Sequence, residues 1–294
     1  MSTAAHENDA VRARAAADAR SRTLAGVATA YRWEWTKLGA QLKTQAVVVV
    51  VIVAPFLFVA VEKAQSTSPT DTLFGRWVHT SGFAIPLVAL SFAAQWAFPA
   101  LACIVAGDIF SSEDRHRTWK TILTRSRTRG QIFAGKALVA ATWTVLIVIV
   151  LGGMSLLAGA AFVGRQPMIG LTGQVVDPGA CAGLVVLSWL TTLPAVLGFA
   201  ALGIFCSVLF RSSVAGVGAP VIIGLLMQLS TLITTPPPVK ALLLSPPLES
   251  WHGLWTQPRF TGPFVQGVIT CTGYVVVFTV AAYVVAARRD VAAR

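Results

Sequence analysis

Residues 137–163 read ALVAATWTVLIVIVLGGMSLLAGAAFV, an apolar stretch with no Asp, Glu, Lys, Arg or His. A helix of roughly 17–25 apolar residues can cross the hydrocarbon core of a bilayer, which is about 30 Å thick. Five more uncharged apolar stretches occur, and the shortest, residues 46–61, reaches full width only with Thr44 and Gln45. The sequence therefore predicts an all-α membrane protein with six transmembrane helices, at about 44–61, 82–106, 137–163, 181–210, 214–233 and 265–287.

The composition agrees with a membrane protein. Of the 294 residues, 55% are hydrophobic and 12% are charged, and the mean hydropathy is +0.70. Soluble domains carry about 25% charged residues, so these values exclude a soluble enzyme and a disordered chain. The four cysteines lie in or beside the apolar stretches without metal-ligand spacing, which indicates packing residues.

The net charge of +11 could by itself indicate a nucleic-acid-binding protein, but its placement indicates topology. All but five of the 23 basic residues fall in residues 1–45, 107–136, 211–213 and 288–294, on one side of the predicted spans. Cytoplasmic loops retain positive charge, so both termini are predicted to be cytoplasmic, with basic residues near anionic lipid. No nucleic-acid partner is expected.

Two features concern the shape of the later spans. The fourth span is long enough to tilt or to bend at Pro194, and residues 211–213 leave a tight hairpin between the fourth and fifth spans. Small residues at 215–219 favour a close helix approach, and Pro220 after them is a possible hinge.

The N-terminal segment divides at residue 24. Residues 1–23 are rich in Ala and Arg, lack the apolar core of a signal peptide, and are expected to form a flexible cytoplasmic tail that is frayed or loosely helical. Apolar residues then recur at spacings of three and four: Leu24, Val27, Tyr31, Trp35 and Leu38. This pattern predicts an amphipathic interfacial helix over residues 24–43, lying on the inner leaflet.

The loop of residues 107–136 is the longest cytoplasmic loop between predicted spans. Ser111 and Asp114 form a helix-capping pattern, and Trp119, Ile122 and Leu123 share one face of the helix that would follow. Such a helix suits the docking of a cytoplasmic partner, although an ordinary basic loop that fixes topology explains the same residues. Residues 130–137 resemble a phosphate-binding loop, but Ala137 lacks the required hydroxyl and no strand precedes it, which argues against ATP binding.

The external segment, residues 234–262, is too apolar for a free loop and too rich in proline for a span. We expect a broken, partly re-entrant or interfacial segment between spans five and six, anchored by Trp251 and Trp255. A helix that lies flat on the membrane without a functional role is the alternative.

Residues 108–136 carry Glu113, Thr118, Leu123, Arg129 and the Gly135–Lys136 pair in an order that resembles the signature of type-2 ATP-binding cassette (ABC) exporter permeases. Those permeases contain the ABC transporter transmembrane domain of the type V exporter fold. Arg117 replaces the usual Gly, and Ser126 lies near the usual Pro. The interfacial helix, the six spans and the broken external segment extend the resemblance over residues 24–290.

The resemblance implies a permease that dimerises with a second permease, identical or different, and binds two copies of a separate cytoplasmic ABC ATPase. ATP and Mg²⁺ would be held by that ATPase, so this chain would bind no cofactor or metal and would not itself be an enzyme. The short helix after the second span would be the coupling helix. The residues implied in ATPase coupling are Ser111, Glu113, Asp114, Arg115, Arg117, Thr118 and Trp119, with Glu34 and Lys37 on the interfacial helix.

In the family the second and fifth spans line the central cavity. The residues that this places on the translocation pathway are Gln95, Trp96, Met227, Gln228 and Thr231. Helix packing explains the two glutamines equally well.

The predicted spans contain no ionisable residue, whereas proton- or ion-coupled transporters place such groups in the membrane. Together with this absence, the resemblance implies a multi-pass protein of a bacterial plasma membrane that uses an external ATPase for export. The uncharged spans favour an apolar or amphipathic substrate, such as a drug, lipid or peptide, and a polysaccharide stays open as an alternative. A secondary transporter or a membrane scaffold is the alternative. A membrane-embedded enzyme is less favoured, because the sequence has neither His-Glu-x-x-His nor Gly-x-Ser-x-Gly.

Overall fold

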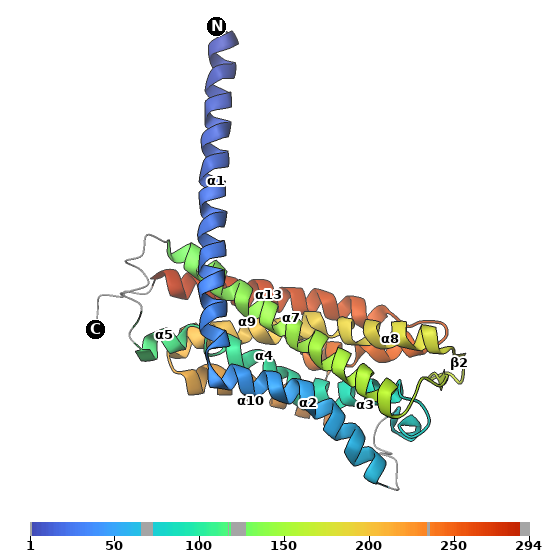
Figure 1. Cartoon of the computed structure of the whole chain (residues 1–294). Coiled ribbons are helices and arrows are strands. Elements are labelled where there is room, and N and C mark those ends of the chain that lie inside the picture. The colour runs from blue at the N-terminus through green and yellow to red at the C-terminus, as the bar shows by residue number, and fades with distance from the viewer. Residues whose placement is uncertain (1, 66–72, 117, 119–127, 234–235, 289–294) are drawn as a thin grey trace.

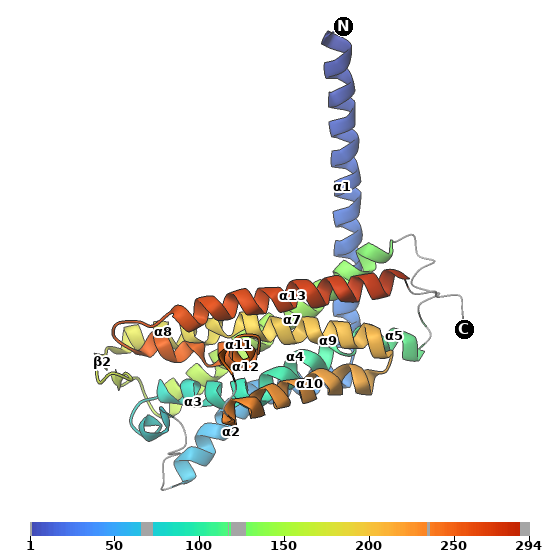
Figure 2. The same cartoon turned by 180° about the vertical axis from the view of Figure 1, so that it is seen from behind.

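The computed structural model describes residues 2–65, 73–116, 118, 128–233 and 236–288. Most of the residues that the structure describes are helical. Its long helices run side by side in one bundle, and α1 crosses the end of this bundle (Figures 1 and 2). The α-helices are α1 (Ser2–Gly39), α2 (Leu42–Ala64), α3 (Ala84–Phe92), α4 (Phe98–Ala106), α5 (Ser111–His116), α7 (Arg129–Phe162), α8 (Pro178–Thr191), α9 (Leu193–Phe210), α10 (Ser213–Leu229), α11 (Pro237–Lys240), α12 (Ser245–Leu248) and α13 (Gly262–Arg288).

Shorter elements connect these helices. Three of them are 3₁₀ turns: η1 (Gly75–Trp77), η3 (Ser230–Leu232) and η4 (Ser250–Trp255). A π-helical turn, η2 (Ala93–Ala97), joins α3 to α4. The strands β1 (Met168–Ile169) and β2 (Val175–Val176) pair antiparallel, with Met168 opposite Val176, and form a small hairpin before α8.

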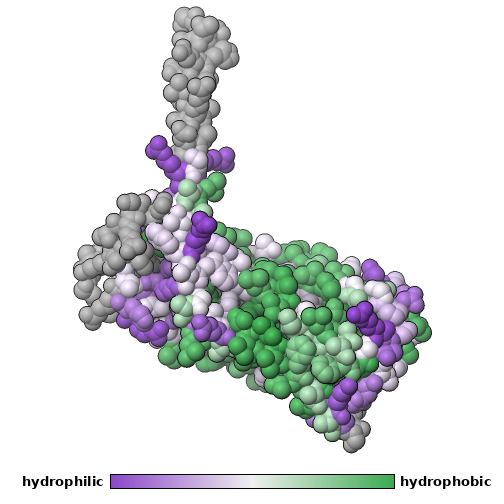
Figure 3. Space-filling view, viewed as in Figure 1, coloured by the Kyte–Doolittle hydropathy of each residue, from purple (hydrophilic) through white to green (hydrophobic). Residues whose placement is uncertain are grey.

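Five helical segments are long and apolar enough to cross a membrane: α2, α3 with α4, α7, α8 with α9, and α13. The space-filling view shows a hydrophobic band between more hydrophilic ends (Figure 3). The architecture is therefore consistent with an all-α membrane protein. Helix α10 has 17 residues, about 26 Å at 1.5 Å per residue, and η3 extends it, so the sixth span stays a prediction.

The N-terminal helix has different bounds from those expected. Helix α1 runs without interruption from Ser2 to Gly39, so residues 2–23 continue the helix that was expected to begin at residue 24. This stretch contains no Gly or Pro before Gly26 and is rich in Ala and Arg, which are strong helix formers. Helix α1 also ends before residue 43, because α2 already begins at Leu42.

The apolar stripe of α1 packs on protein. Tyr31, Trp35 and Leu38 contact the hydrophobic core, with α7 as the main neighbour of α1, whereas Leu24 is 70% exposed. A Cβ atom on Gly135 would lie 2.6 Å from the Cβ of Ala30, so the glycine allows α1 and α7 to cross closely. The stripe was expected on the inner leaflet, but most of it covers α7.

Two of the spans begin or bend in ways that their sequence explains. Helix α7 starts at Arg129 and not at residue 137, because Thr128 and Gln131 form a reciprocal capping box at its N-terminus. The helix of the fourth span is interrupted at Thr192, and Pro194 lies in the first turn of α9. Arg211, at a φ of 54°, makes the tight turn before α10.

Helix α9 is the most buried of the long helices and packs against α4, α7, α10 and α13. The four cysteines are buried and unpaired, as expected for packing residues. Gly216 makes the close approach predicted for residues 215–219, because a Cβ there would lie 2.2 Å from the carbonyl oxygen of Gly107. Pro220 lies within a continuous α10, so the helix does not break there.

The external segment consists of α11, α12 and η4. The side chains of Trp251 and Trp255 are fully buried, and both rings contact Phe74, with centroids 5.9 and 5.3 Å away. Trp255 also donates a hydrogen bond from Nε1 to Ser188 Oγ of α8 at 3.0 Å. The two tryptophans therefore fix this segment to the protein interior and not to the membrane interface, while re-entry into the bilayer stays a prediction.

Candidate functional site

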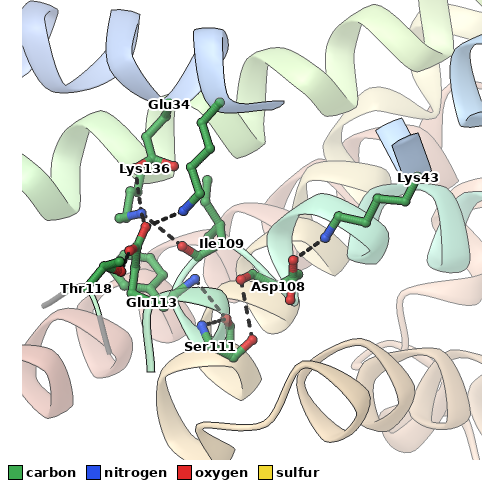
Figure 4. Close-up of polar contacts among 11 residues, drawn as sticks. Glu34, Lys43, Asp108, Ile109, Ser111, Glu113, Thr118 and Lys136 are labelled. Atoms are coloured by element: carbon green, nitrogen blue, oxygen red, sulfur yellow. Dashed lines mark hydrogen bonds and ion pairs between the residues drawn. The ribbon is translucent and has the colours of Figure 1, made fainter. Parts of the chain in front are cut away.

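A cluster of charged side chains lies where α1 crosses α7 and the segment after α4 passes beneath them (Figure 4). Helix α1 supplies Glu34 and Lys37, α5 supplies Glu113, and the second turn of α7 supplies Lys136. We call these four residues the ion-pair cluster. Three segments that are distant in sequence thus meet through opposite charges.

Lys136 is the centre of the ion-pair cluster. Its side chain is fully buried, and its Nζ lies 2.6 Å from Glu34 Oε1, 2.9 Å from Glu113 Oε1 and 3.0 Å from the carbonyl oxygen of Ile109. An ammonium group has three hydrogen-bond donors, so these three acceptors satisfy it completely. The Nζ also lies 5.7 Å from the centroid of the Phe110 ring.

Glu113 connects both lysines. Its Oε1 accepts from Lys37 as well as from Lys136, and its Oε2 accepts from the hydroxyl of Thr118. Burial raises the pKa of Glu113, but the charges of Lys136 and Lys37 and the hydrogen bond from Thr118 outweigh burial and lower the pKa to about 2. Glu113 is therefore ionised at neutral pH, and the two carboxylates balance the two ammonium groups.

A second ion pair joins the start of α2 to the end of the second span. Lys43 donates to Asp108 Oδ2. Burial raises the pKa of Asp108, yet the hydrogen bonds from Lys43 and Ser213 and the charges of Lys43 and Arg115 lower it overall. The segment from Asp108 to Glu113 is thus held by lysines from three helices, α1, α2 and α7.

A pocket of about 320 Å³ opens above the ion-pair cluster, between α1, α5 and α7. Trp33 and Ile132 give it apolar walls, and the ion-pair cluster lines it as well. Trp33 is 43% exposed. The side chain of Lys37 is 37% exposed and can meet solvent or a bound partner.

The structure brings together two of the residues assigned to coupling, Glu113 and Thr118, with the two residues assigned to the interfacial helix, Glu34 and Lys37. Ser111 is buried nearby, Asp114 is half-buried and Arg115 is exposed. Arg117 and Trp119 lie outside the described residues.

The residues assigned to a translocation pathway lie on two neighbouring elements. Gln95 and Trp96 belong to the π turn η2, which contacts α10, the helix of Met227 and Gln228. Trp96 is 59% exposed, and Gln95, Met227 and Gln228 are half-buried. Thr231 is exposed, and its hydroxyl donates to the carbonyl oxygen of Gln228 at 2.6 Å.

Sequence reasoning missed the partners of Lys136 and the pair of Lys43 with Asp108. A lysine directly before a long apolar stretch is usual at the cytoplasmic end of a span, so the position of Lys136 in the sequence gives no signal of its buried partners. The phosphate-loop alternative is excluded, because residues 130–136 form the first turns of α7. Within the described part of the chain, no group of three His, Cys, Asp or Glu residues could hold a metal ion.

These features define an all-α protein with at least five candidate membrane helices and a buried charged cluster at one end of the bundle. Residues 44–292 match the family model described as "Protein of unknown function (DUF2705)". The match covers most of the chain, which therefore belongs to this family. Comparison with curated proteins gives no match.

Proposed function

We propose that this chain is the permease subunit of an ATP-driven ABC exporter, with six spans and both termini in the cytoplasm of a bacterium. One observation carries the proposal. Among the residues whose order resembles the permease signature, Glu113 contacts both Thr118 and Lys136, and Lys136 holds the N-terminal helix through Glu34.

The ion-pair cluster gives a physical route for coupling. Salt bridges that are buried and fully hydrogen-bonded are costly to separate, so the linked segments are expected to move together. A partner that displaces α5 would therefore displace α1 and α7 as well, since Lys136 is bonded to Glu113 and to Glu34. Motion that begins at the cytoplasmic surface would in this way reach the membrane helices.

The spans support an external energy source. The central stretches of the apolar helices contain no Asp, Glu, Lys, Arg or His, the residues that proton-coupled transporters place in the membrane. We infer that a separate cytoplasmic ATPase, in two copies, supplies ATP and Mg²⁺. A second permease would complete the pathway beside η2 and α10, and the substrate would be apolar or amphipathic.

The test is affinity purification of the full chain from membranes of its native host in mild detergent. We expect an ABC ATPase to co-purify and to hydrolyse ATP in a vanadate-sensitive manner. Arg115→Glu reverses an exposed charge on α5 and should weaken this co-purification. Arg165→Glu is the matched control, because Arg165 is also exposed but follows the other end of α7.

The outcomes separate the alternatives. A chain that co-purifies with no ATPase, even after chemical crosslinking in the membrane, would contradict the proposal. Flux that an ion gradient drives in vesicles without ATP would identify a secondary transporter. Equal co-purification of both charge-reversed variants would exclude α5 as the docking element.

A further inference from the structure

We propose that Ser207 is a positioning residue that fixes the segment of residues 107–113 to α9 and α10, on the side opposite the ion-pair cluster. The role of Ser207 in transmitting motion rests on the proposed function, whereas the contacts of Ser207 do not depend on it. Neither the permease signature nor the ion-pair cluster includes this residue.

One buried hydroxyl holds the start of α5. Ser207 lies in α9 and is fully buried, and its Oγ accepts hydrogen bonds from the backbone N–H groups of Phe110 at 3.1 Å and Ser111 at 3.0 Å. The first N–H groups of a helix have no partner inside that helix. Both amides are buried, so the loss of this oxygen would leave two donors without their acceptor.

Two further contacts join the same segment to α10. A Cβ atom on Gly216 would lie 2.2 Å from the carbonyl oxygen of Gly107, and a Cβ on Gly107 would lie 2.4 Å from that of Gly216. The two backbones therefore touch without intervening side chains. The hydroxyls of Ser111 and Ser213 also lie 3.4 Å apart.

Residues 107–113 are thus held from two sides. Glu113 attaches the segment to α1 and α7 through lysines, whereas Ser207 and Gly216 attach it to α9 and α10. Helix α10 continues to Met227 and Gln228, beside the π turn of the second span. A Cβ atom on Gly216 would also lie 3.1 Å from the Cα of Ser207, so α10 packs directly on this part of α9. Ser207 and Gly216 are therefore placed to pass a displacement of α5 on to α9 and α10.

The experiment measures distances between spin labels in the purified full-length complex. One label pair, on His116→Cys and Leu226→Cys, reports α5 against α10, and a second pair, on His116→Cys and Leu146→Cys, reports α5 against α7. All three positions are exposed, while the native cysteines are buried. Each pair is measured without nucleotide and with ATP and vanadate, after co-purification of the labelled complex has been verified.

Ser207→Ala should broaden the distance distribution between α5 and α10 and abolish its nucleotide-dependent shift. The distribution between α5 and α7 should stay as in the wild type, because the ion pairs remain. The control is Ser155→Ala: Ser155 is fully buried too, but its hydroxyl donates only to Leu151 of its own helix at 2.7 Å. Ser207→Thr, which keeps the acceptor oxygen, should restore the narrow distribution.

Gly216→Ala tests the same attachment independently, with Gly218→Ala as its control, because a Cβ on Gly218 meets nothing within 4 Å. If either Ser207→Ala or Gly216→Ala fails to fold, the other variant alone tests the attachment of α5 to α9 and α10. A distribution between α5 and α10 that stays narrow in a folded anchor variant overturns the inference. If the wild-type complex shows no nucleotide-dependent shift, this result counts against the proposed function. The attachment through Ser207 is still tested, because the variants and the wild type can be compared without nucleotide.

Discussion

Lys136 Nζ and Glu113 Oε1 lie 2.9 Å apart, and neither side chain is more than 4% exposed. An ion pair this deeply buried gains little over a well-packed apolar pair, because both charges lose their hydration. Removal of one partner is far more costly, since the other charge remains buried without compensation. The structure therefore predicts that the residues of the ion-pair cluster depend strongly on one another.

Lys136→Met should lower the free energy of unfolding by about 3–5 kcal/mol, because Glu34 and Glu113 would both lose their shared cation. Thermal unfolding of the purified protein in detergent measures the change. Lys240→Met is the matched control, since Lys240 is exposed on α11 and its loss should have little effect. Addition of Glu113→Gln to Lys136→Met should cost less than the sum of the two single changes, and strict additivity would argue against the cluster.

The stability that Glu113 contributes should depend on pH in the acidic range. Its pKa falls from the usual 4.5 to about 2 in the folded protein, so folding favours the ionised form. This contribution is fully present above pH 4.5 and is lost as the pH falls toward 2. Between pH 4.5 and 2, the Glu113→Gln variant should therefore lose less stability than the wild type. Unfolding of both proteins at a series of pH values measures this difference. Parallel curves for the two proteins would contradict the assignment.

Gly135→Ala should separate α1 from α7. The new methyl group would lie 2.6 Å from the Cβ of Ala30, and packing conflicts of this kind cost about 1–3 kcal/mol. Gly153→Ala is the control in the same helix, because a Cβ there meets nothing within 4 Å. The melting temperature should fall for the first variant and stay the same or rise for the second. Equal changes in melting temperature for the two variants would mean that the packing of α1 on α7 does not depend on Gly135.

Trp255→Ala should destabilise the external segment by about 3–5 kcal/mol, because it removes a fully buried ring and the hydrogen bond to Ser188. Trp96→Ala, at a ring that is 59% exposed, should change stability far less. Chemical unfolding in detergent, followed by circular dichroism, compares the two variants. A larger loss for Trp96→Ala would show that this ring is covered by a partner in the purified protein.

Local sequence signals predicted the apolar helices well. Length and the absence of charge identified the centres of α2, α7 and α13, and Pro194 marked the break in the fourth span. The capping residues Thr128 and Gln131 could also have indicated the early start of α7, because their spacing is readable in the sequence. The low glycine content of residues 2–25 could have indicated a continuous α1.

The partners within the candidate site could not be derived in this way. Lys136 pairs with Glu34, which lies 102 residues away in the sequence, and Ser207 accepts a hydrogen bond from Phe110, which lies 97 residues away. Such contacts depend on how the helices cross, which the hydrophobic pattern of each helix does not specify. The same holds for Trp251 and Trp255, whose aromatic character suits a membrane interface and a protein core equally.

Glycines at both ends of the second span bring its backbone into close contact with neighbouring helices. Gly82 touches the backbone of Gly159 at one end, and Gly107 touches that of Gly216 at the other. Between these contacts lies the π turn of Ala93–Ala97, which holds one residue more than an α-helical turn. One extra residue rotates everything that follows by about 100°. The extra residue of the π turn thus sets the rotation of α4 about its axis. That rotation in turn sets the direction in which Asp108 and the residues after it leave the bundle, although the π turn contains none of the charged residues.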